Sequence, residues 1–335
     1  MNRERIQQLA FRRGFNRFRV ASVEHGVGIG NYDRYLSKGR HGTMSWMVRS
    51  RPPRVDCRSL LPSAQSVIVL GVDYRHPIPE KPSGLVGRVS CYAWGRDYHN
   101  LIGKRLRSLC KELKALEPTI ETYFGVDSRP FIERAWAERA GMGFVGKNCM
   151  IISPADSSYF FLGMILINRQ LPIDRPITKD HCGRCRRCLD RCPTNAFVGE
   201  RELDSRKCIS YLTIEHKGDI PQQYWSGIGN WLFGCDVCQE VCPHNHRLLL
   251  SQHPDLAPRP KHAWVDLEWL FRAADSEILE EFTGTPLRRT GVERLRRNAA
   301  VTLSNVKDPT AKGFAQQIYP KVSPMVQRHL QWSLS

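Results

Sequence analysis

Four cysteines near the middle of the chain have the spacing of iron–sulfur ligands. Cys182, Cys185 and Cys188 are separated by two residues each, and Cys192 follows three residues later, directly before Pro193. In such a run the first three thiolates bind one 4Fe–4S cluster and the fourth binds a second cluster. The spacing therefore predicts a pair of clusters that pass single electrons.

A second group of cysteines lies further along the chain. Cys235, Cys238 and Cys242 repeat the ending of the first run, again with a proline after the last thiol, but its first cysteine is missing. Cys208 is the nearby cysteine that can supply this ligand. Two complete sets of four thiolates then follow. The first is Cys182, Cys185, Cys188 and Cys242, and the second is Cys192, Cys208, Cys235 and Cys238.

Tetrahedral zinc is the alternative for these cysteines, because pairs of Cys-x2-Cys also suit zinc. The two endings with a three-residue gap and a proline favour clusters. The chain holds twelve cysteines, and a reducing compartment disfavours disulfides. The four remaining thiols are expected to be small buried side chains. They are Cys57, Cys91, Cys110 and Cys149.

The composition indicates a globular protein with a basic surface. The chain has 335 residues, 41% hydrophobic and 25% charged, with a formal net charge of +17. A surplus of this size favours a polyanionic partner such as nucleic acid; a merely arginine-rich surface is the alternative. There is no apolar run of membrane-spanning length and no export signal, so we expect a cytoplasmic protein without a membrane partner.

The elements that position these groups are predicted from hydrophobic patterns, which indicate a mixed α+β fold. Apolar runs at 66–72 and 159–168 are typical of buried strands, and 19–23 is a shorter candidate. Helices are expected at 98–116 and 131–140. We expect three domains. They are a catalytic α/β domain at 1–175, a two-cluster domain at 176–252 and a helical region at 253–335.

Two stretches of the first domain carry more polar groups than packing requires. Residues 90–99 read SCYAWGRDYH directly before a helix, and Asp97 is the expected N-cap. In residues 127–148, three glycines follow a helix, which allows the backbone to approach a large ligand closely. This order is not a dinucleotide-binding fingerprint. Asp127 is, from the pattern alone, a candidate helix cap.

The C-terminal region contains an arginine-rich helix. Residues 288–297 carry five arginines against one glutamate, and the helix is expected to continue to Asn305. Arg294 and Arg297 are candidate contacts to RNA phosphates. A further helix is expected at 325–334. Two helices joined by a Lys-Asp-Pro turn resemble one HEAT-type repeat, and a plain packing hairpin is the alternative.

Together these motifs resemble the epoxyqueuosine reductases. The resemblance rests on GRDYH at 95–99, on AERAG and GKN within 127–148, on the cysteine framework, and on CISYLTIEHKG at 208–218. That family reduces an epoxide on a modified guanine at the wobble position of tRNA, which yields queuosine. The resemblance implies a base-off cobalamin in a first domain similar to nitroreductases and reductive dehalogenases. It also implies a ferredoxin-like domain with two 4Fe–4S clusters and HEAT-like helices that hold tRNA.

The same resemblance implies roles for individual residues and partners. Asp127 matches the proton donor, and its pKa should then be raised. Arg134 matches an arginine near the substrate. Further RNA contacts are implied at Lys217, Arg297 and Asn298. Cobalamin contacts are implied at Arg54, Ser90, Asp127, Ile151 and Leu162. A monomer that takes electrons from a low-potential donor such as flavodoxin or ferredoxin is expected.

Two other classes share part of this pattern. Corrinoid reductive dehalogenases combine cobalamin with two clusters, but they typically carry an export signal and have no need of so basic a surface. A ferredoxin-type electron-transfer protein explains the eight cysteines. It leaves residues 127–148 and the arginine-rich helix without a role.

Overall fold

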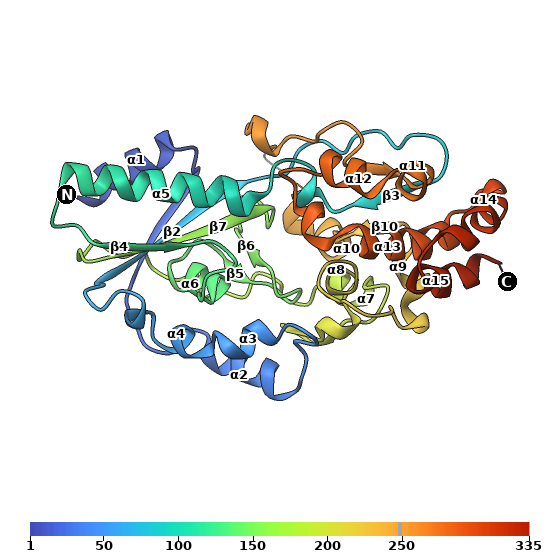
Figure 1. Cartoon of the computed structure of the whole chain (residues 1–335). Helices are drawn as coiled ribbons and strands as arrows, with labels where there is room; N and C mark the ends of the chain where they lie inside the picture. Colours follow the sequence, from blue (N-terminus) through green and yellow to red (C-terminus); the bar gives the residue numbers. More distant parts are fainter. Residues whose placement is uncertain (247–249, 335) are drawn as a thin grey trace.

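The first half of the chain is built on a four-stranded antiparallel sheet. The computed structural model describes residues 1–246 and 250–334, and it places the two termini at opposite ends of the molecule (Figure 1). The strand order is β1-β2-β7-β4. In the register, Ser66 of β2 lies opposite Ser22 of β1 and Ile167 of β7. The strands are β1 (Arg17–Ser22), β2 (Ser66–Asp73), β4 (Thr122–Gly125) and β7 (Phe160–Ile167).

Both faces of this sheet are covered, which explains why β2 and β7 are apolar along their whole length. Every residue of the two strands is buried. On one face Ile68 and Ile165 share a core with α1 (Arg3–Arg12) and α5 (Tyr98–Leu116). On the other face Val69 and Met164 pack with α6 (Glu133–Arg139). Strands covered on both sides read as continuous apolar runs rather than alternating ones.

A second sheet joins the three regions that the sequence suggests. It has the order β10-β3-β11, and Arg88 of β3 lies opposite Trp231 on one side and Trp264 on the other. The guanidinium of Arg88 stacks over the ring of Trp231 at 4.3 Å. Each region thus contributes one strand, so backbone hydrogen bonds link all three. The strands are β3 (Val86–Val89), β10 (Trp231–Phe233) and β11 (Trp264–Asp266).

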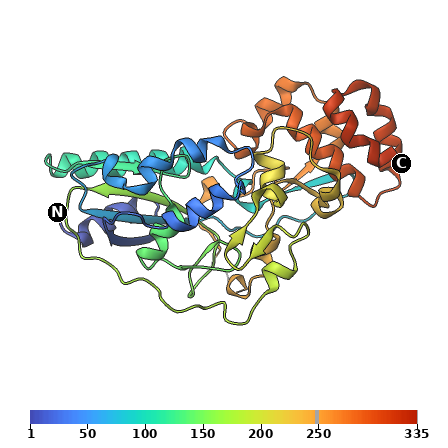
Figure 2. The same ribbon diagram turned by 90° about the horizontal axis from the view of Figure 1, so that it is seen from below.

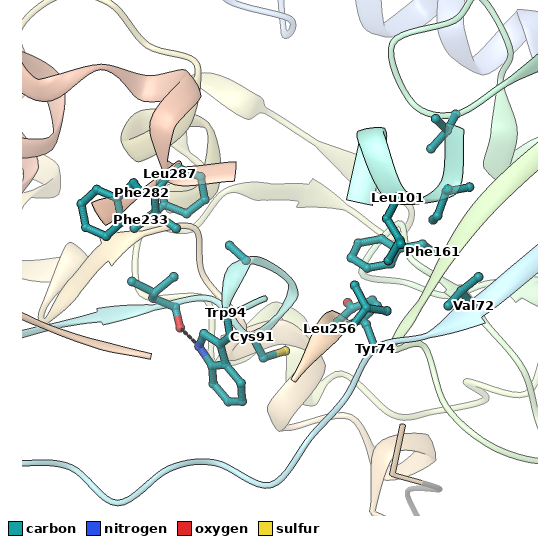
Figure 3. Close-up of a cluster of buried hydrophobic side chains, with 14 of the residues drawn as sticks. Val72, Tyr74, Cys91, Trp94, Leu101, Phe161, Phe233, Leu256, Phe282 and Leu287 are labelled. Carbon is teal, nitrogen blue, oxygen red and sulfur yellow. Dashed lines mark hydrogen bonds between the residues drawn. The ribbon is translucent and has the colours of Figure 1, made fainter. Parts of the chain in front are cut away.

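The two sheets are connected through a shared aromatic core. Figure 3 shows Leu101 and Phe161 of the first half on one side and Phe233 and Phe282 on the other, with Trp94 and Cys91 between them. Trp94 is fully buried, and its indole N–H donates to the carbonyl of Val89 at 2.8 Å. The first half of the chain therefore packs directly against the cluster region and the C-terminal helices.

Helix α13 (Val292–Asn305) is the centre of the C-terminal region. It packs against β10 and against α11 (Leu267–Arg272), α14 (Thr310–Ile318) and α15 (Pro324–Leu334). In Figure 2 the long connection between β7 and the cluster region runs along the outside of the molecule. The remaining elements are short. They are α2 (Ile29–Ser37), α3 (Ser45–Arg49), α4 (Arg51–Val55), β5 (Phe144–Val145), β6 (Ile151–Ile152), α7 (Arg187–Asp190), β8 (Phe197–Gly199), β9 (Glu202–Leu203), α8 (Ile209–Ile214), α9 (Trp225–Ile228), α10 (Val237–Glu240) and α12 (Asp275–Glu281).

The predicted elements can be compared with these bounds. The strands at 66–72 and 159–168 and the helix at 98–116 are confirmed, and the strand at 19–23 begins earlier, at Arg17. The helix at 131–140 is shorter, because it starts only at Glu133. The arginine-rich helix starts at Val292, since Gly291 at φ +80° separates it from a 3-10 turn at Pro286–Thr290. Among the described residues, no helix has the length and apolar character needed to cross a bilayer.

Candidate active site and cluster site

Asp127 lies on the loop between β4 and α6 in an unusual backbone conformation. Its φ is +47°, in the left-handed region that L-residues enter at a cost of about 1–2 kcal/mol. The backbone N–H of Asp127 donates to Oε1 of Glu133 at 2.6 Å, which holds this turn. Ile132 occupies the N-cap of α6. Asp127 therefore does not cap a helix, and its carboxylate is available for other contacts.

The first turn of α5 brings a row of polar groups to Asp127. The hydroxyl of Tyr98 donates to the Asp127 carboxylate, and Nε2 of His99 lies 2.8 Å from the same oxygen. Nδ1 of His99 lies 2.7 Å from Oδ1 of Asp97, whose other oxygen accepts from Arg289 at 2.8 Å. Asp97 also caps α5, as predicted. Charges thus alternate along the row Asp127, His99, Asp97 and Arg289.

The hydrogen bonds along this row shift the pKa values of His99 and Asp127. Burial lowers the pKa of His99, but the hydrogen bonds from Asp127 and Asp97 outweigh it and raise the pKa to about 9. Burial raises the pKa of Asp127, but the hydrogen bond from His99 outweighs it and the net direction is down. At neutral pH the pair is an imidazolium and a carboxylate. The expected rise in the pKa of Asp127 is therefore wrong, because the hydrogen bond from His99 lowers it.

The carboxyl group with a raised pKa is Glu133. Burial is the main cause and the negative charge of Asp127 adds to it, so the pKa of Glu133 rises to about 8. Two carboxyl groups that adjoin in this way cannot both ionise readily. Glu133 is therefore the neutral partner beneath the Asp127 loop at neutral pH.

Asp127 and His99 lie on the wall of a large cavity. Its volume is about 1580 Å³, whereas small-molecule sites usually have about 300–1000 Å³. The side chain of Asp127 is 48% exposed, and this exposure is toward the cavity. Apolar groups of Val27, Met44 and Trp46 form another part of the wall. The basic groups on the wall are Arg34, Arg40, Arg134, Arg139, Arg201, Lys217, Arg289 and Arg294.

The expected RNA contacts divide into two groups. Arg134, Lys217 and Arg294 are on the cavity wall. Arg297 and Asn298 are fully buried, at 0% exposure. The Arg297 guanidinium donates to the carbonyls of His216 and Gly218, at 2.8 and 2.6 Å, on either side of Lys217. Asn298 donates to the carbonyls of Thr213 and Leu232. As direct RNA contacts these two residues do not fit the structure. Arg297 holds the loop that carries Lys217, and Asn298 links α8 to β10.

The other expected cobalamin contacts are not on the cavity wall. Arg54 is buried and donates to the carbonyl of Phe131, at the foot of the Asp127 loop. Ser90 donates to Asp236 within the cluster region. Ile151 and Leu162 belong to the apolar core against α6. The structure thus places all four behind the wall, where they support it.

The first set of expected cluster ligands comes together between α7 and α10. The pKa of the Cys188 thiol is raised to about 11, first by burial and then by the charges of Cys242, Cys182 and Cys185. Burial and the charges of Cys182 and Cys185 also raise the pKa of Cys242. The N–H of Cys185 donates to the carbonyl of Cys182 at 2.9 Å, which curls the loop around this point.

The second set of expected ligands lies around Cys208, the residue that immediately precedes α8. Burial raises the pKa of Cys208, and the charge of Cys192 adds to it. Burial and the charges of Cys208 and Cys192 raise the pKa of Cys235, and burial with Cys235 and Cys208 raises that of Cys238. Cys208 is therefore a neighbour of all three thiols, although it stands outside any Cys-x2-Cys pair.

Both sets suit the corners of a cluster, where each thiolate binds a separate iron. The N–H of Ala196 donates to the sulfur of Cys192 at 3.3 Å. Within residues 1–246 and 250–334, no group of three or more His, Cys, Asp or Glu side chains is arranged around a single metal ion. Among the remaining thiols, Cys57, Cys91 and Cys110 are buried as predicted. The prediction is wrong for Cys149, which is partly exposed on the cavity wall at φ +63°.

The two sets differ in their relation to the cavity. Cys208 of the second set is on the cavity wall, whereas no ligand of the first set is among the described wall residues. Cys188 influences the pKa of Cys238, so the two sets adjoin. Electrons that enter at the first set would therefore pass through the second set to reach the cavity.

Sequence reasoning did not assign roles to His99, Tyr98, Arg289 or Glu133. His99 and Tyr98 belong to the GRDYH motif, which carries part of the resemblance to the family but assigns no role to either residue. The signal that could have identified His99 is its position two residues after a helix-capping aspartate, since a histidine there can bond to the cap. The sequence around Arg289 and Glu133 does not indicate their partners, because these partners lie on other elements.

Comparisons with known proteins show which family models and relatives this chain resembles. A family model described as epoxyqueuosine reductase QueG, DUF1730, matches residues 54–128, and one described as a 4Fe-4S double cluster binding domain matches residues 181–245. The epoxyqueuosine reductase of Pseudomonas aeruginosa is 40% identical over 333 residues, covering 96% of this chain and 90% of the relative. That of Escherichia coli strain K12 is 35% identical, covering 99% and 88%.

Two solved structures are similar over nearly the whole chain. An epoxyqueuosine reductase with an epoxyqueuosine-modified tRNA-Tyr stem loop has a TM-score of 0.89 and 31% identity, covering 99% of this chain and 88% of that one. The Bacillus subtilis enzyme, with an aspartate-bearing catalytic loop swung out of its active site, has a TM-score of 0.89 and 31% identity, covering 99% and 89%.

Proposed function

The chain belongs to the epoxyqueuosine reductase family of oxidoreductases, and from this premise we propose that it reduces epoxyqueuosine to queuosine at the wobble position of tRNA. One observation carries the proposal. The proton-bearing pair of His99 and Asp127 and the cluster ligand Cys208 reach the same cavity. A proton source and an electron source thus meet where a large substrate has room.

The reaction sets the demands on this cavity. Conversion of an epoxide to an alkene with loss of water consumes two electrons and two protons. The two thiol sets, loaded with 4Fe–4S clusters, deliver electrons singly. A base-off cobalamin, when bound, supplies the two-electron chemistry at the substrate. The apolar side chains of Val27, Met44 and Trp46 on the cavity wall would hold such a macrocycle.

Asp127 is the residue that delivers the proton. The leaving oxygen of the epoxide becomes an alkoxide, and an acid within about 3 Å of it lowers the barrier. The Asp127 carboxylate takes the proton from Nε2 of His99 and passes it to this oxygen. The second proton, with which the oxygen leaves as water, reaches the same pair from the solvent of the cavity. Asp97 holds the imidazole through Nδ1, and Arg289 holds Asp97. The aspartate-bearing catalytic loop of the Bacillus subtilis relative supports a loop-borne carboxylate in this role.

Basic groups at the cavity receive the RNA. Arg134, Lys217 and Arg294 are on its wall, where their charges can contact phosphates in a sequence-independent way. A base that reacts inside such a cavity has to leave its stack. The relative with a bound tRNA stem loop supports this substrate class. A role in electron transfer alone would leave the cavity and its basic wall without use.

The test uses anaerobically purified holoenzyme and tRNA that carries epoxyqueuosine. Metal analysis should give about eight irons per chain, as two four-iron clusters require, together with about one cobalt per chain, as a single bound cobalamin requires. Reduction with a chemical electron donor should convert the modified nucleoside to queuosine, which mass spectrometry of the digested tRNA detects. A fully loaded protein that leaves epoxyqueuosine unchanged would end the proposal.

A further inference from the structure

Four exposed arginines are interleaved with the ligands of the first thiol set. Cys182, Cys185, Cys188 and the following Cys192 alternate with these basic side chains along a single loop and the short helix α7. We refer to the four as the cluster-loop arginines. They are Arg184, Arg186, Arg187 and Arg191, all exposed.

The cluster-loop arginines are largely free of internal partners. Arg186 pairs with Asp190 at 3.6 Å, a contact between two exposed side chains that is worth little. Among the described residues, Arg184, Arg187 and Arg191 make no side-chain ion pair. By contrast, Arg296 and Arg297 donate to backbone carbonyls. The charge of the loop therefore points outward.

The loop lies where electrons must enter. The cavity receives the substrate, and Cys208 of the second set forms part of its wall. The first set is on the far side of the second, and its Cys182 and Cys185 are partly exposed. A reductant that arrives from solution therefore meets the first set. The exposed charges closest to that point in the sequence are the cluster-loop arginines.

We propose that the cluster-loop arginines form the docking surface for an acidic electron-carrier protein, which delivers electrons to the first thiol set. The inference rests on the proposed function, because only a loaded cluster needs a donor. Each encounter takes one electron from the reduced carrier and adds one to the cluster, and two encounters supply the pair that the epoxide requires. Complementary charge accelerates such short-lived encounters, and redox partners typically share small interfaces.

RNA is the competing occupant of a basic surface, but the placement favours a protein donor. None of the four arginines is among the residues of the cavity wall, which has basic groups of its own in Arg134, Lys217 and Arg294. A tRNA held at the cavity thus has its own charges to bind. The cluster-loop arginines are therefore available to a protein that transfers electrons to the cluster and does not enter the cavity.

The experiment compares two charge-reversed holoenzymes. Arg187→Glu with Arg191→Glu changes the cluster loop, and Arg107→Glu with Lys111→Glu applies the same charge change to the exposed side of α5. The probe is a reduced acidic flavodoxin, and stopped-flow absorbance near 400 nm follows cluster reduction. At low salt the cluster-loop variant should lose about 10–100-fold in the second-order rate constant, within the range that electrostatic steering covers. The α5 variant should lose less than the cluster-loop variant at low salt, and its rate should match the parent at about 0.1 M salt, where the Debye length is about 10 Å.

Three further measurements keep the outcomes distinct. The iron content of the cluster-loop variant should match the parent protein, and its rate of reduction by photoreduced deazaflavin, a small donor, should be unchanged. If the charge-reversed variant loses iron, Arg187→Gln with Arg191→Gln replaces it. A smaller loss of the flavodoxin rate is expected for this neutral variant. Equal flavodoxin rates in parent and cluster-loop variants would overturn the proposal. The proposal would also be overturned if the cluster-loop variant kept the parental flavodoxin rate and lost affinity for a tRNA anticodon stem loop. Queuosine formation with deazaflavin tests the proposed function separately, since it bypasses the protein donor.

Discussion

Nε2 of His99 lies 2.8 Å from Oδ2 of Asp127, although the two residues come from different elements. His99 is in the first turn of α5, and Asp127 is on the loop after β4. Because each residue stabilises the charged form of the other, the pKa of His99 is raised and that of Asp127 is lowered. At neutral pH these opposite pKa shifts favour an imidazolium on His99 beside a carboxylate on Asp127.

Replacement of Asp127 by asparagine should abolish most turnover while leaving the protein intact. Asparagine keeps the size of the side chain and tolerates the left-handed conformation at φ +47°. The rate of single-turnover epoxide reduction should fall by about 10²–10⁴-fold, the usual contribution of a general acid. Iron and cobalt content should be unchanged. The matched control is Asp308→Asn on the exposed turn before α14; parental turnover in Asp127→Asn would exclude the proton-donor role.

The pH dependence of the single-turnover rate should follow the ionisation of His99. Since its folded-state pKa of about 9 lies above the ordinary value of 6.5, the charged pair and its contribution to stability are complete below pH 6.5 and are lost as the pH rises through 9. The single-turnover rate should therefore fall on the alkaline side with a midpoint near 9. His99→Gln should remove this limb and slow the reaction at pH 7 by about 10–100-fold, at the lower end of acid–base effects. An alkaline limb that persists in the variant would assign it to another group.

The strands and the long helix of the first half could be predicted because their signals are local. β2 and β7 are continuous apolar runs, and α5 has its apolar face, its cap at Asp97 and its end before Pro118 all within one stretch. The ligand sets could be proposed from spacing and number. The link between His99 and Asp127 could not be foreseen, because it depends on how a loop after β4 folds back over α5.

The arginine-rich helix shows why charge alone misleads. Five arginines between 288 and 297 indicate an exposed surface, yet three of them serve the interior. Arg294 donates to the carbonyl of Ile214, the last residue of α8, and Arg296 donates to the carbonyls of Leu270 and Ala273 at the end of α11. Arginine side chains commonly satisfy the free carbonyls of helix C-termini. A sequence does not show which neighbouring helix will present such carbonyls.

Glu133 gives a prediction about stability. Its pKa is raised from 4.5 to about 8, so its contribution to stability is complete below pH 4.5 and is lost as the pH rises through 8. Glu133→Gln cannot ionise, and its amide oxygen can still accept the N–H of Asp127. The variant should therefore lose less thermal stability than the parent between pH 5 and 9. Thermal unfolding across this range measures the effect, with Glu80→Gln on an exposed loop as the control. Parallel curves for Glu133→Gln and the parent would contradict the assignment.

Cys208 should prove to be a cluster ligand. Its serine variant should retain the first set of thiols and lose the second cluster, so iron should fall from about eight to about four per chain. Cys57→Ser and Cys110→Ser alter buried thiols of the core and should leave iron unchanged. A full complement of iron in Cys208→Ser would show that the second set has a different fourth ligand.

Arg294 and Arg297 should differ in what they support, although they are three residues apart on α13. Arg294 and Lys217 are on the cavity wall, so Arg294→Ala with Lys217→Ala should weaken binding of a tRNA anticodon stem loop. Each lost phosphate contact should flatten the slope of log affinity against log salt by about 0.7–0.9. Arg297 is fully buried and donates to the carbonyls of Leu212, His216 and Gly218.

Loss of the Arg297 guanidinium leaves these carbonyls without a donor, at a cost of about 1–3 kcal/mol for a buried unsatisfied group. Arg297→Met should therefore lower the free energy of unfolding and leave the salt slope of RNA binding as in the parent. Denaturant unfolding and binding measured at several salt concentrations separate the two residues. A reduced salt slope in Arg297→Met, with parental stability, would restore Arg297 as a direct RNA contact.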